Sequence, residues 1–309
     1  MLHPRLTRRS VVHGALALGV GAALRVPAFA AEQPLTRAIP KTGERLPVVG
    51  VGTNAYSVTS PEDLNACKEV LQHFPDLGAK VVDTARSYRD SEIVIGKLVK
   101  ELGNRERLFI ATKTPISGDV RAGDGEIEAA FARLQTPKID LMQIHNFHAI
   151  DALFPRLQEW KQAGKVRYIG VTTSSDDQYP RMIDALKTLP VDFIQVDYSI
   201  DNRGAADQIL PLAQTKGVAV LCNMPFGGRR DGNLLRKVAG KPLPDWASEF
   251  GATSWAQLLL KYNLSQPAIT VVIPGTTKLT HLRDNQAAAR GRIPDAAMRK
   301  KIEEFWATI

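Results

Sequence analysis

Four side chains that could carry acid–base chemistry lie at or just after apolar runs of strand length. They are Asp83, Tyr88, Lys113 and His145. A tyrosine hydroxyl has a pKa of about 10, and a lysine ammonium about 4 Å away would lower that pKa by about three units. An aspartate beside the lysine would keep the ammonium charged in a partly buried pocket. We therefore expect Tyr88 to protonate a carbonyl oxygen that His145 orients.

Taken singly, none of these four residues indicates catalysis. A tyrosine near a helix start is usually packed, a lysine after a strand is usually solvated, and a histidine at a strand end is often structural. Their joint occurrence at the ends of three successive predicted strands is what favours a site. Carbonyl reduction also needs a hydride, which no side chain supplies, so the site implies a nicotinamide cofactor.

The chain alternates between strand-like and helix-like patterns. Strands are predicted at 48–51, 80–83, 108–112, 139–144, 166–171, 193–197, 218–222 and 270–273. Helices are predicted near 62–74, 91–102, 124–134, 151–163, 178–188, 205–216, 253–262 and 279–289, with a last one at 295–307. This pattern favours an α/β fold, the (β/α)8 TIM barrel, over a doubly wound sheet, which usually has fewer strands. A turn at 41–44 predicts an N-terminal β-hairpin.

A barrel of this kind places its active site at the carboxyl ends of the strands. The four residues above belong to those ends, and so does Asn54 after the first strand. The longest interruption of the pattern, 227–249, follows the seventh strand. We expect it to form a loop over the barrel mouth.

The motifs around these residues are specific in their order and spacing. The stretch VDTARSY at 82–88, followed by Ser91 and Glu92, resembles the signature of the aldo-keto reductase family. ATK at 111–113, DLMQIH at 140–145, KVRYIGV at 165–171 and IPGTTK at 273–278 resemble later motifs of that family. The resemblance implies a (β/α)8 barrel, with Tyr88 as proton donor, Lys113 and Asp83 tuning it, and His145 orienting the carbonyl.

The resemblance also implies NADPH as the cofactor, in preference to NADH. The residues it assigns to cofactor binding are Thr53, Asn54, Thr172, Thr173, Gln195, Asn223, Pro225, Phe226, Gly227, Gly275, Thr276, Thr277, Lys278, Asp284 and Asn285. Lys278 is the expected partner of the 2′-phosphate, although His281 stands where many members have arginine. Two positions depart from the family pattern. Thr172 and Thr173 replace a Ser-Asn pair, and Asn223 replaces an aromatic residue that often stacks on the nicotinamide.

Residues 1–30 contain no acidic residue and have the pattern of an export signal. Arg8 and Arg9 precede an apolar stretch at 11–24, which ends in an A-x-A cleavage site at 28–30. The paired arginines predict a twin-arginine signal, read by the twin-arginine export machinery, with an ordinary secretory signal as the alternative. We therefore expect an exported, periplasmic protein with a single barrel domain at 31–309 and no stable membrane insertion after cleavage.

Composition sets further limits. The chain has 309 residues, of which 44% are hydrophobic and 23% charged, and this excludes a disordered protein. Four of its 40 Lys and Arg residues lie in 1–30, so half of the net charge of +8 belongs there and a nucleic-acid partner gains little support. Cys67 and Cys222 lie in apolar segments and are expected to be buried free thiols, with a disulfide as the alternative. No cysteine–histidine spacing predicts a metal site.

Two classes of function fit these observations. The leading hypothesis is an exported oxidoreductase that reduces small aldehydes or ketones. The alternative is a protein that holds a nicotinamide cofactor with little turnover, because an exported protein meets no obvious pool of NADPH and Asn223 removes the stacking ring. A metal-dependent hydrolase with a barrel fold is a third and less favoured hypothesis.

Overall fold

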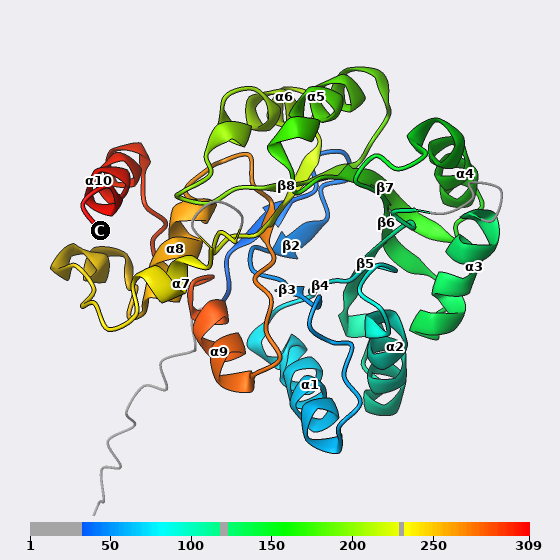
Figure 1. The fold of residues 1–309 in the computed structure, drawn as a ribbon, viewed down its shortest axis with the longest axis horizontal. Coiled ribbons are helices and arrows are strands. Elements are labelled where there is room, and N and C mark those ends of the chain that lie inside the picture. Colours follow the sequence, from blue (N-terminus) through cyan, green and yellow to red (C-terminus); the bar gives the residue numbers. More distant parts are fainter. Residues whose placement is uncertain (1–32, 118–122, 229–231) are drawn as a thin grey trace, which may run out of the picture. The chain divides into compact units, whose positions relative to one another are not determined.

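The computed structural model describes residues 33–117, 123–228 and 232–309, and Gln33–Ile309 form one compact unit. Within these residues, eight parallel strands stand side by side in chain order (Figure 1). They are β3 (Val51–Gly52), β4 (Val81–Asp83), β5 (Phe109–Lys113), β6 (Ile139–His145), β7 (Val166–Thr172), β8 (Phe193–Asp197), β9 (Ala219–Asn223) and β10 (Val271–Val272). The export signal expected at 1–30 lies outside the described residues.

The sheet closes on itself beside its first strand. Val49 and Gly52 form parallel bridges to Val272 and Gly275, and the amide of Gly50 donates to the carbonyl of Val272 over 2.8 Å. Backbones approach so closely here that a Cβ on Gly50 would lie 2.7 Å from the carbonyl oxygen of Val81. The predicted strand 48–51 is therefore reduced to β3 and isolated bridges, and the barrel is nearly closed.

Helices surround the barrel, as Figure 1 shows. They are α1 (Pro61–His73), α2 (Ser91–Leu102), α3 (Gly123–Leu134), α4 (Ile150–Gln162), α5 (Tyr179–Thr188), α6 (Ile209–Thr215), α8 (Trp255–Leu264) and α9 (Leu279–Ala287). A short helix, α7 (Leu234–Lys237), and a 3₁₀-helix (Asp245–Phe250) lie in the long loop after β9, and α10 (Ala296–Trp306) ends the chain. The (β/α)8 TIM barrel predicted from the sequence is confirmed.

Two helix boundaries differ from prediction for local reasons. The helix predicted at 205–216 is split into a 3₁₀-turn (Gly204–Ala206) and α6. Pro211 lacks an amide hydrogen and is best tolerated in the first turn of a helix, where α6 places it, so it disfavours one continuous helix from 205 to 216. The helix predicted at 253–262 starts later, because the Ser254 hydroxyl accepts a hydrogen bond from the amide of Gln257 and caps α8.

Side chains along the strands alternate between two buried layers. In β6, Met142 and Ile144 face the helices, whereas Leu141 belongs to the core inside the barrel. Since alternate residues share a face, the interior continues through Gln143 to His145 at the carboxyl end. The same alternation in β5 carries the interior face from Ala111 to Lys113. The alternation therefore places polar side chains at the carboxyl ends of the strands, inside a barrel whose interior is otherwise mainly apolar.

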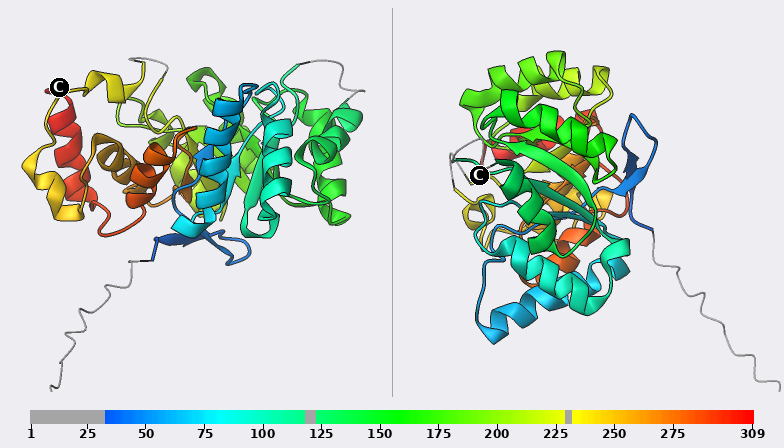
Figure 2. Two further views of the ribbon diagram at one scale, coloured as in Figure 1. Left: turned by 90° about the horizontal axis from the view of Figure 1, so that it is seen from below. Right: turned by 90° about the vertical axis from the view of Figure 1, so that its right-hand side faces the viewer.

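The predicted N-terminal hairpin is formed by β1 (Thr36–Ala38) and β2 (Arg45–Pro47). It lies across one end of the barrel (Figure 2), where Ile39 and Leu46 join the interior core. The Lys41 ammonium donates to the carbonyl of Val191, a residue just before β8. The hairpin therefore covers the amino ends of the strands and leaves the carboxyl ends accessible.

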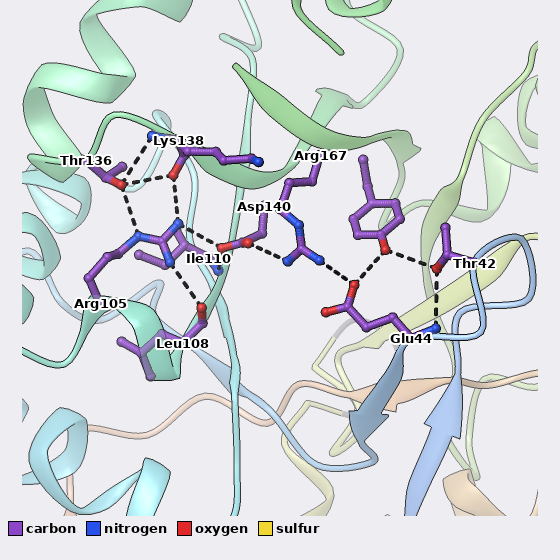
Figure 3. Close-up of polar contacts among 10 residues, drawn as sticks. Thr42, Glu44, Arg105, Leu108, Ile110, Thr136, Lys138, Asp140 and Arg167 are labelled. Carbon is purple, nitrogen blue, oxygen red and sulfur yellow. Dashed lines mark hydrogen bonds and ion pairs between the residues drawn. The ribbon is translucent and has the colours of Figure 1, made fainter. Parts of the chain in front are cut away.

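A charged network joins the hairpin to the strands (Figure 3). The carboxylate of Asp140 accepts hydrogen bonds from Arg105 and Arg167, each over 2.8 Å, and from the amide of Ile110. Arg167 also forms an ion pair with Glu44 of the hairpin turn, and the Tyr168 hydroxyl donates to the same carboxylate over 2.6 Å. Each charge in this network has a partner, which indicates a structural role at the end of the barrel away from the predicted site.

Both cysteines are free and buried, as expected. Burial raises the pKa of the Cys67 thiol to about 11, so the thiol stays protonated at neutral pH. Among the helices of the described residues, none is both long and apolar enough to cross a membrane.

Candidate active site

A cavity of about 470 Å³ lies at the carboxyl ends of the strands. Its walls include Asp83 from the end of β4, Lys113 from the end of β5 and His145 from the end of β6. Tyr88 reaches the same cavity from the loop between β4 and α2. The four residues selected for acid–base chemistry therefore lie together in space.

Asp83 and Lys113 form a buried ion pair, in which the ammonium lies 2.7 Å from Asp83 Oδ2. Both side chains are at most 2% exposed, and the ammonium also donates to the carbonyl of Thr84 over 2.8 Å. Burial alone would lower the pKa of Lys113, but the charges of Asp83 and Tyr88 raise it above its ordinary value. The lysine therefore stays charged beside the tyrosine, as the sequence predicted.

Tyr88 is half-buried against this ion pair. Its ring centroid lies 5.1 Å from the Lys113 nitrogen, and its ring meets that of His145 edge-on at 6.4 Å between centroids. The charge of Lys113 lowers the pKa of Tyr88, but burial and the negative charge of Asp83 raise it by more. The net pKa lies above the ordinary value, which corrects our expectation of a lowered one. That expectation counted the lysine charge and omitted the desolvation and the neighbouring carboxylate.

His145 is held neutral by its surroundings. Burial and the nearby charge of Lys113 lower the pKa of His145 to about 3. Its Nδ1 atom lies 3.4 Å from the Ser87 hydroxyl, and its backbone amide donates to the Thr114 hydroxyl over 3.1 Å. A neutral imidazole carries one ring N–H, so His145 can donate a hydrogen bond without bringing a second positive charge next to Lys113.

The backbone turns sharply after three of the residues in the cavity wall. Arg89, Asn146 and Met224 directly follow Tyr88, His145 and Asn223, and all three have φ between 49° and 54°. This left-handed conformation costs a residue other than glycine about 1–2 kcal/mol, and such strain gathers at functional sites.

Nine of the residues assigned to cofactor binding line the cavity: Thr53, Asn54, Thr172, Gln195, Asn223, Pro225, Phe226, Gly227 and Gly275. The others lie outside its wall, namely Thr173, Thr276, Thr277, Lys278, Asp284 and Asn285. Three of these have side-chain partners within the fold, and the Thr173 hydroxyl donates to Gln178 Oε1 over 2.7 Å. The carboxylate of Asp284 accepts from Ser254 and Gln257 over 2.8 and 2.7 Å, and the Thr276 hydroxyl accepts from the amide of Lys278.

Asn223 stands where relatives often have an aromatic ring. Only one of its two side-chain polar atoms has a hydrogen-bond partner among the described residues. Its amide nitrogen donates to the carbonyl of Thr173 over 3.0 Å. Its Oδ1 atom is buried and has no hydrogen-bond partner in the described part of the chain. Nearby, a Cβ on Gly275 would lie 3.0 Å from the amide oxygen of Asn54, so the glycine lets the Asn54 side chain pack against the backbone in this part of the wall.

The cavity wall also contains residues to which the sequence analysis assigned no role: Gly52, Asn146, Ser174, Met224, Gly228, Asn233 and Ile273. The strand-end rule selects Asn146, Ser174 and Met224, which follow the ends of β6, β7 and β9 within two residues, but no role was assigned to them. The predicted loop 227–249 contributes Gly228 and Asn233 to the wall, and this places its first part at the mouth. Residues 229–231 of that loop lie outside the described residues. Across the described ranges, no three His, Cys, Asp or Glu side chains gather as a metal site would require.

Comparison with known proteins assigns the chain to a family. The model of the aldo/keto reductase family matches residues 48–307. The chain belongs to the aldo/keto reductase family. The four residues Asp83, Tyr88, Lys113 and His145 (the tetrad), the eight strands and all the residues assigned to cofactor binding fall within the matched segment.

Curated relatives and solved structures of this family cover most of the chain. A fission-yeast (Schizosaccharomyces pombe) protein named as an NADP(+) aldo-keto reductase is 24% identical over 84% of this chain and 88% of its own length. The aldo-keto reductase YhdN of Bacillus subtilis is 30% identical over 59% of each chain. The holo structure of an aldo-keto reductase from Bacillus halodurans superposes with a TM-score of 0.71 at 22% identity, covering 88% of this chain and 96% of its own. A Klebsiella pneumoniae structure in complex with NADP and acetate gives 0.66 at 23% identity, covering 85% and 93%.

Proposed function

We propose that this protein reduces a small aldehyde or ketone to the alcohol with NADPH, and that Tyr88 is the proton donor. The observation that carries the proposal is the convergence of Tyr88, the Asp83–Lys113 ion pair and neutral His145 in one cavity. Membership of the family and the NADP named for two of its relatives support a nicotinamide cofactor.

Each residue of the tetrad has a defined part in this reaction. The ring N–H of His145 donates to the carbonyl oxygen and orients it, because the imidazole is neutral at the pH of the reaction. The raised pKa of Tyr88 keeps its proton in place until negative charge develops on that oxygen. Lys113 then stabilises the tyrosinate that remains, and Asp83 keeps Lys113 charged. Solvent restores the proton to Tyr88 after the alcohol leaves.

The cavity wall has groups suited to a nicotinamide nucleotide. Asn54 and Gly275 line the wall, and the Asn223 Oδ1 atom, which has no hydrogen-bond partner among the described residues, could accept from a carboxamide N–H. Thr172 and Gln195 lie in the same wall. A reduced nicotinamide bound there would supply the hydride that carbonyl reduction requires. We assign the preference for NADPH over NADH to Lys278, as a point charge for the 2′-phosphate.

The proposal is tested by following NADPH oxidation with a panel of small aldehydes. Turnover by the wild-type chain that is lost in Tyr88→Phe is the expected result. Absence of turnover with every aldehyde tested, with both NADPH and NADH, would contradict it. A matched control is Tyr56→Phe, because Tyr56 is a fully buried tyrosine of the barrel core outside the cavity wall.

The second candidate function is storage or sensing of the cofactor with little turnover. It is favoured by Asn223, which removes the ring that often stacks on the nicotinamide. The two candidates differ in one measurement. A sensor binds NADPH tightly and fails to oxidise it with any carbonyl, whereas a reductase does both.

We further propose that the protein is exported through the twin-arginine machinery to the periplasm. The support is the pattern of Arg8, Arg9 and the apolar stretch at 11–24. Replacing both arginines by lysine is expected to retain the full-length chain in the cytoplasm of a bacterial host, as fractionation and immunoblotting would show. Unchanged export would indicate the ordinary secretory route.

A further inference from the structure

A line of buried amides extends the tetrad toward the barrel interior. Gln143 Nε2 donates to Gln195 Oε1 over 3.0 Å, and Gln195 Nε2 donates to Asp83 Oδ2 over 3.3 Å. Asp83 Oδ2 also receives the ammonium of Lys113. These side chains come from β6, β8, β4 and β5, and none is more than 2% exposed. Gln143 is the Cα partner of Lys113 across the β5–β6 ladder, one layer below His145.

The negative charge of Asp83 determines the orientation of the side-chain amides of Gln195 and Gln143. A carboxylate only accepts hydrogen bonds, so Gln195 must present its nitrogen to Asp83. Its oxygen then faces Gln143, which must in turn present its own nitrogen. If either amide were reversed, two oxygens would face one another in a buried space. Consistent with this polarity, Gln143 Oε1 and Asp83 Oδ1 are the atoms left without a partner among the described residues.

We propose that Gln143 is a positioning residue that holds Gln195 with its amide N–H toward Asp83 and the cavity. Gln143 occupies one lone pair of the Gln195 oxygen and Asp83 takes one N–H, so the second N–H of the Gln195 amide is left to donate to a ligand. An acceptor group of the cofactor or substrate, such as a carbonyl oxygen, can bind this N–H. The identity of the ligand that contacts Gln195 rests on the proposed function, whereas the orientation of the Gln195 amide does not.

The same arrangement affects the ion pair at the centre of the site. Burial raises the pKa of Asp83 above its ordinary value, and the charge of Lys113 and the hydrogen bonds from Lys113 and Gln195 oppose this rise. The ionisable groups around Asp83 in the cavity are Lys113 from β5, Tyr88 after β4 and His145 from β6. If Gln195 is released, Asp83 takes up a proton at higher pH and Lys113 loses its counter-ion. The acidic limb of the pH profile of kcat then moves to higher pH.

Nuclear magnetic resonance of the full chain tests the orientation without any catalysis. In protein labelled with ¹⁵N-glutamine, the side-chain resonance of Gln195 is assigned from its loss in Gln195→Met. We expect Gln143→Met to shift this resonance and to increase the hydrogen exchange of the Gln195 amide about tenfold, the equivalent of one hydrogen bond of about 1.4 kcal/mol. A Gln195 resonance with unchanged shift and unchanged exchange would overturn the proposal.

The pH profile of kcat then shows whether Gln143 positions Gln195 or only fills space in the barrel interior. We expect Gln143→Met and Gln195→Met each to shift the acidic limb of the kcat–pH profile to higher pH, by up to about one pH unit. The double variant should move it no further, because both act through one contact to Asp83. An unmoved limb in Gln143→Met, or additive shifts in the double variant, would contradict the proposal. Gln143→Leu serves as the second variant should Gln143→Met fold poorly, and an inactive wild type would refute the proposed function while leaving the resonance experiment decisive.

Discussion

Acidification should destabilise the folded protein through His145. In an unfolded chain a histidine has a pKa of about 6.5, whereas burial and Lys113 lower the pKa of His145 in the folded protein to about 3. Between these two values the unfolded state binds the proton and the folded state does not. The free energy of unfolding therefore falls as the pH drops below about 6.5, and the loss continues until the pH approaches 3.

The size of the effect follows from the two pKa values. Between pH 7 and pH 5, His145 should remove about 2 kcal/mol from the free energy of unfolding. Urea unfolding at both pH values, for the wild type and for His145→Gln, isolates this contribution, since the variant keeps every other titrating group. We expect the variant to lose about 2 kcal/mol less than the wild type over this interval.

The control is His148→Gln, which removes an imidazole outside the cavity wall and leaves His145 in place. It should keep the contribution of about 2 kcal/mol that belongs to His145. If the wild type and His145→Gln showed the same dependence on pH, the imidazole would not be held neutral. The role of His145 as a neutral donor would then be refuted.

Three further perturbations test other parts of the structure. Asp83→Asn leaves the buried Lys113 ammonium without its counter-charge, so urea unfolding at pH 7 should show a loss of about 3–5 kcal/mol, and a loss below about 1 kcal/mol would argue against an obligatory ion pair. Lys278→Met should weaken NADPH binding about tenfold in a fluorescence titration and leave NADH binding unchanged; equal effects on both would remove its role at the 2′-phosphate. Glu44→Gln should cost about 1 kcal/mol in urea unfolding, because its pair with Arg167 is partly exposed, and should leave kcat unchanged because the hairpin lies at the opposite end of the barrel. A large loss of activity in Glu44→Gln would contradict that placement.

Much of the fold could be predicted because strand and helix periodicities are properties of local sequence. The helix at 91–102 and the strand at 193–197 were predicted with the observed boundaries. Errors arose where a single residue overrides the pattern. Pro211 divides one predicted helix, and Ser254 delays the start of another.

The tetrad could be predicted because the strand-end rule and the family motifs select the same residues. Its electrostatics could not be predicted, because they depend on distances and burial. Lys113 lowers the pKa of Tyr88 as expected, yet the desolvation of the ring and the charge of Asp83 reverse the net direction. The role of Gln143 was invisible for a similar reason. Its contact with Gln195 joins strands 52 residues apart in the chain, and nothing in the local sequence marks it.

The central claim is that Tyr88 supplies the proton for carbonyl reduction. Its most direct test is the initial rate of NADPH oxidation by the wild type and by Tyr88→Phe, with a small aldehyde and with cofactor binding measured in parallel. The account predicts that kcat falls about 10²- to 10⁴-fold in the variant while the affinity for NADPH stays the same. An unchanged kcat in Tyr88→Phe would contradict it.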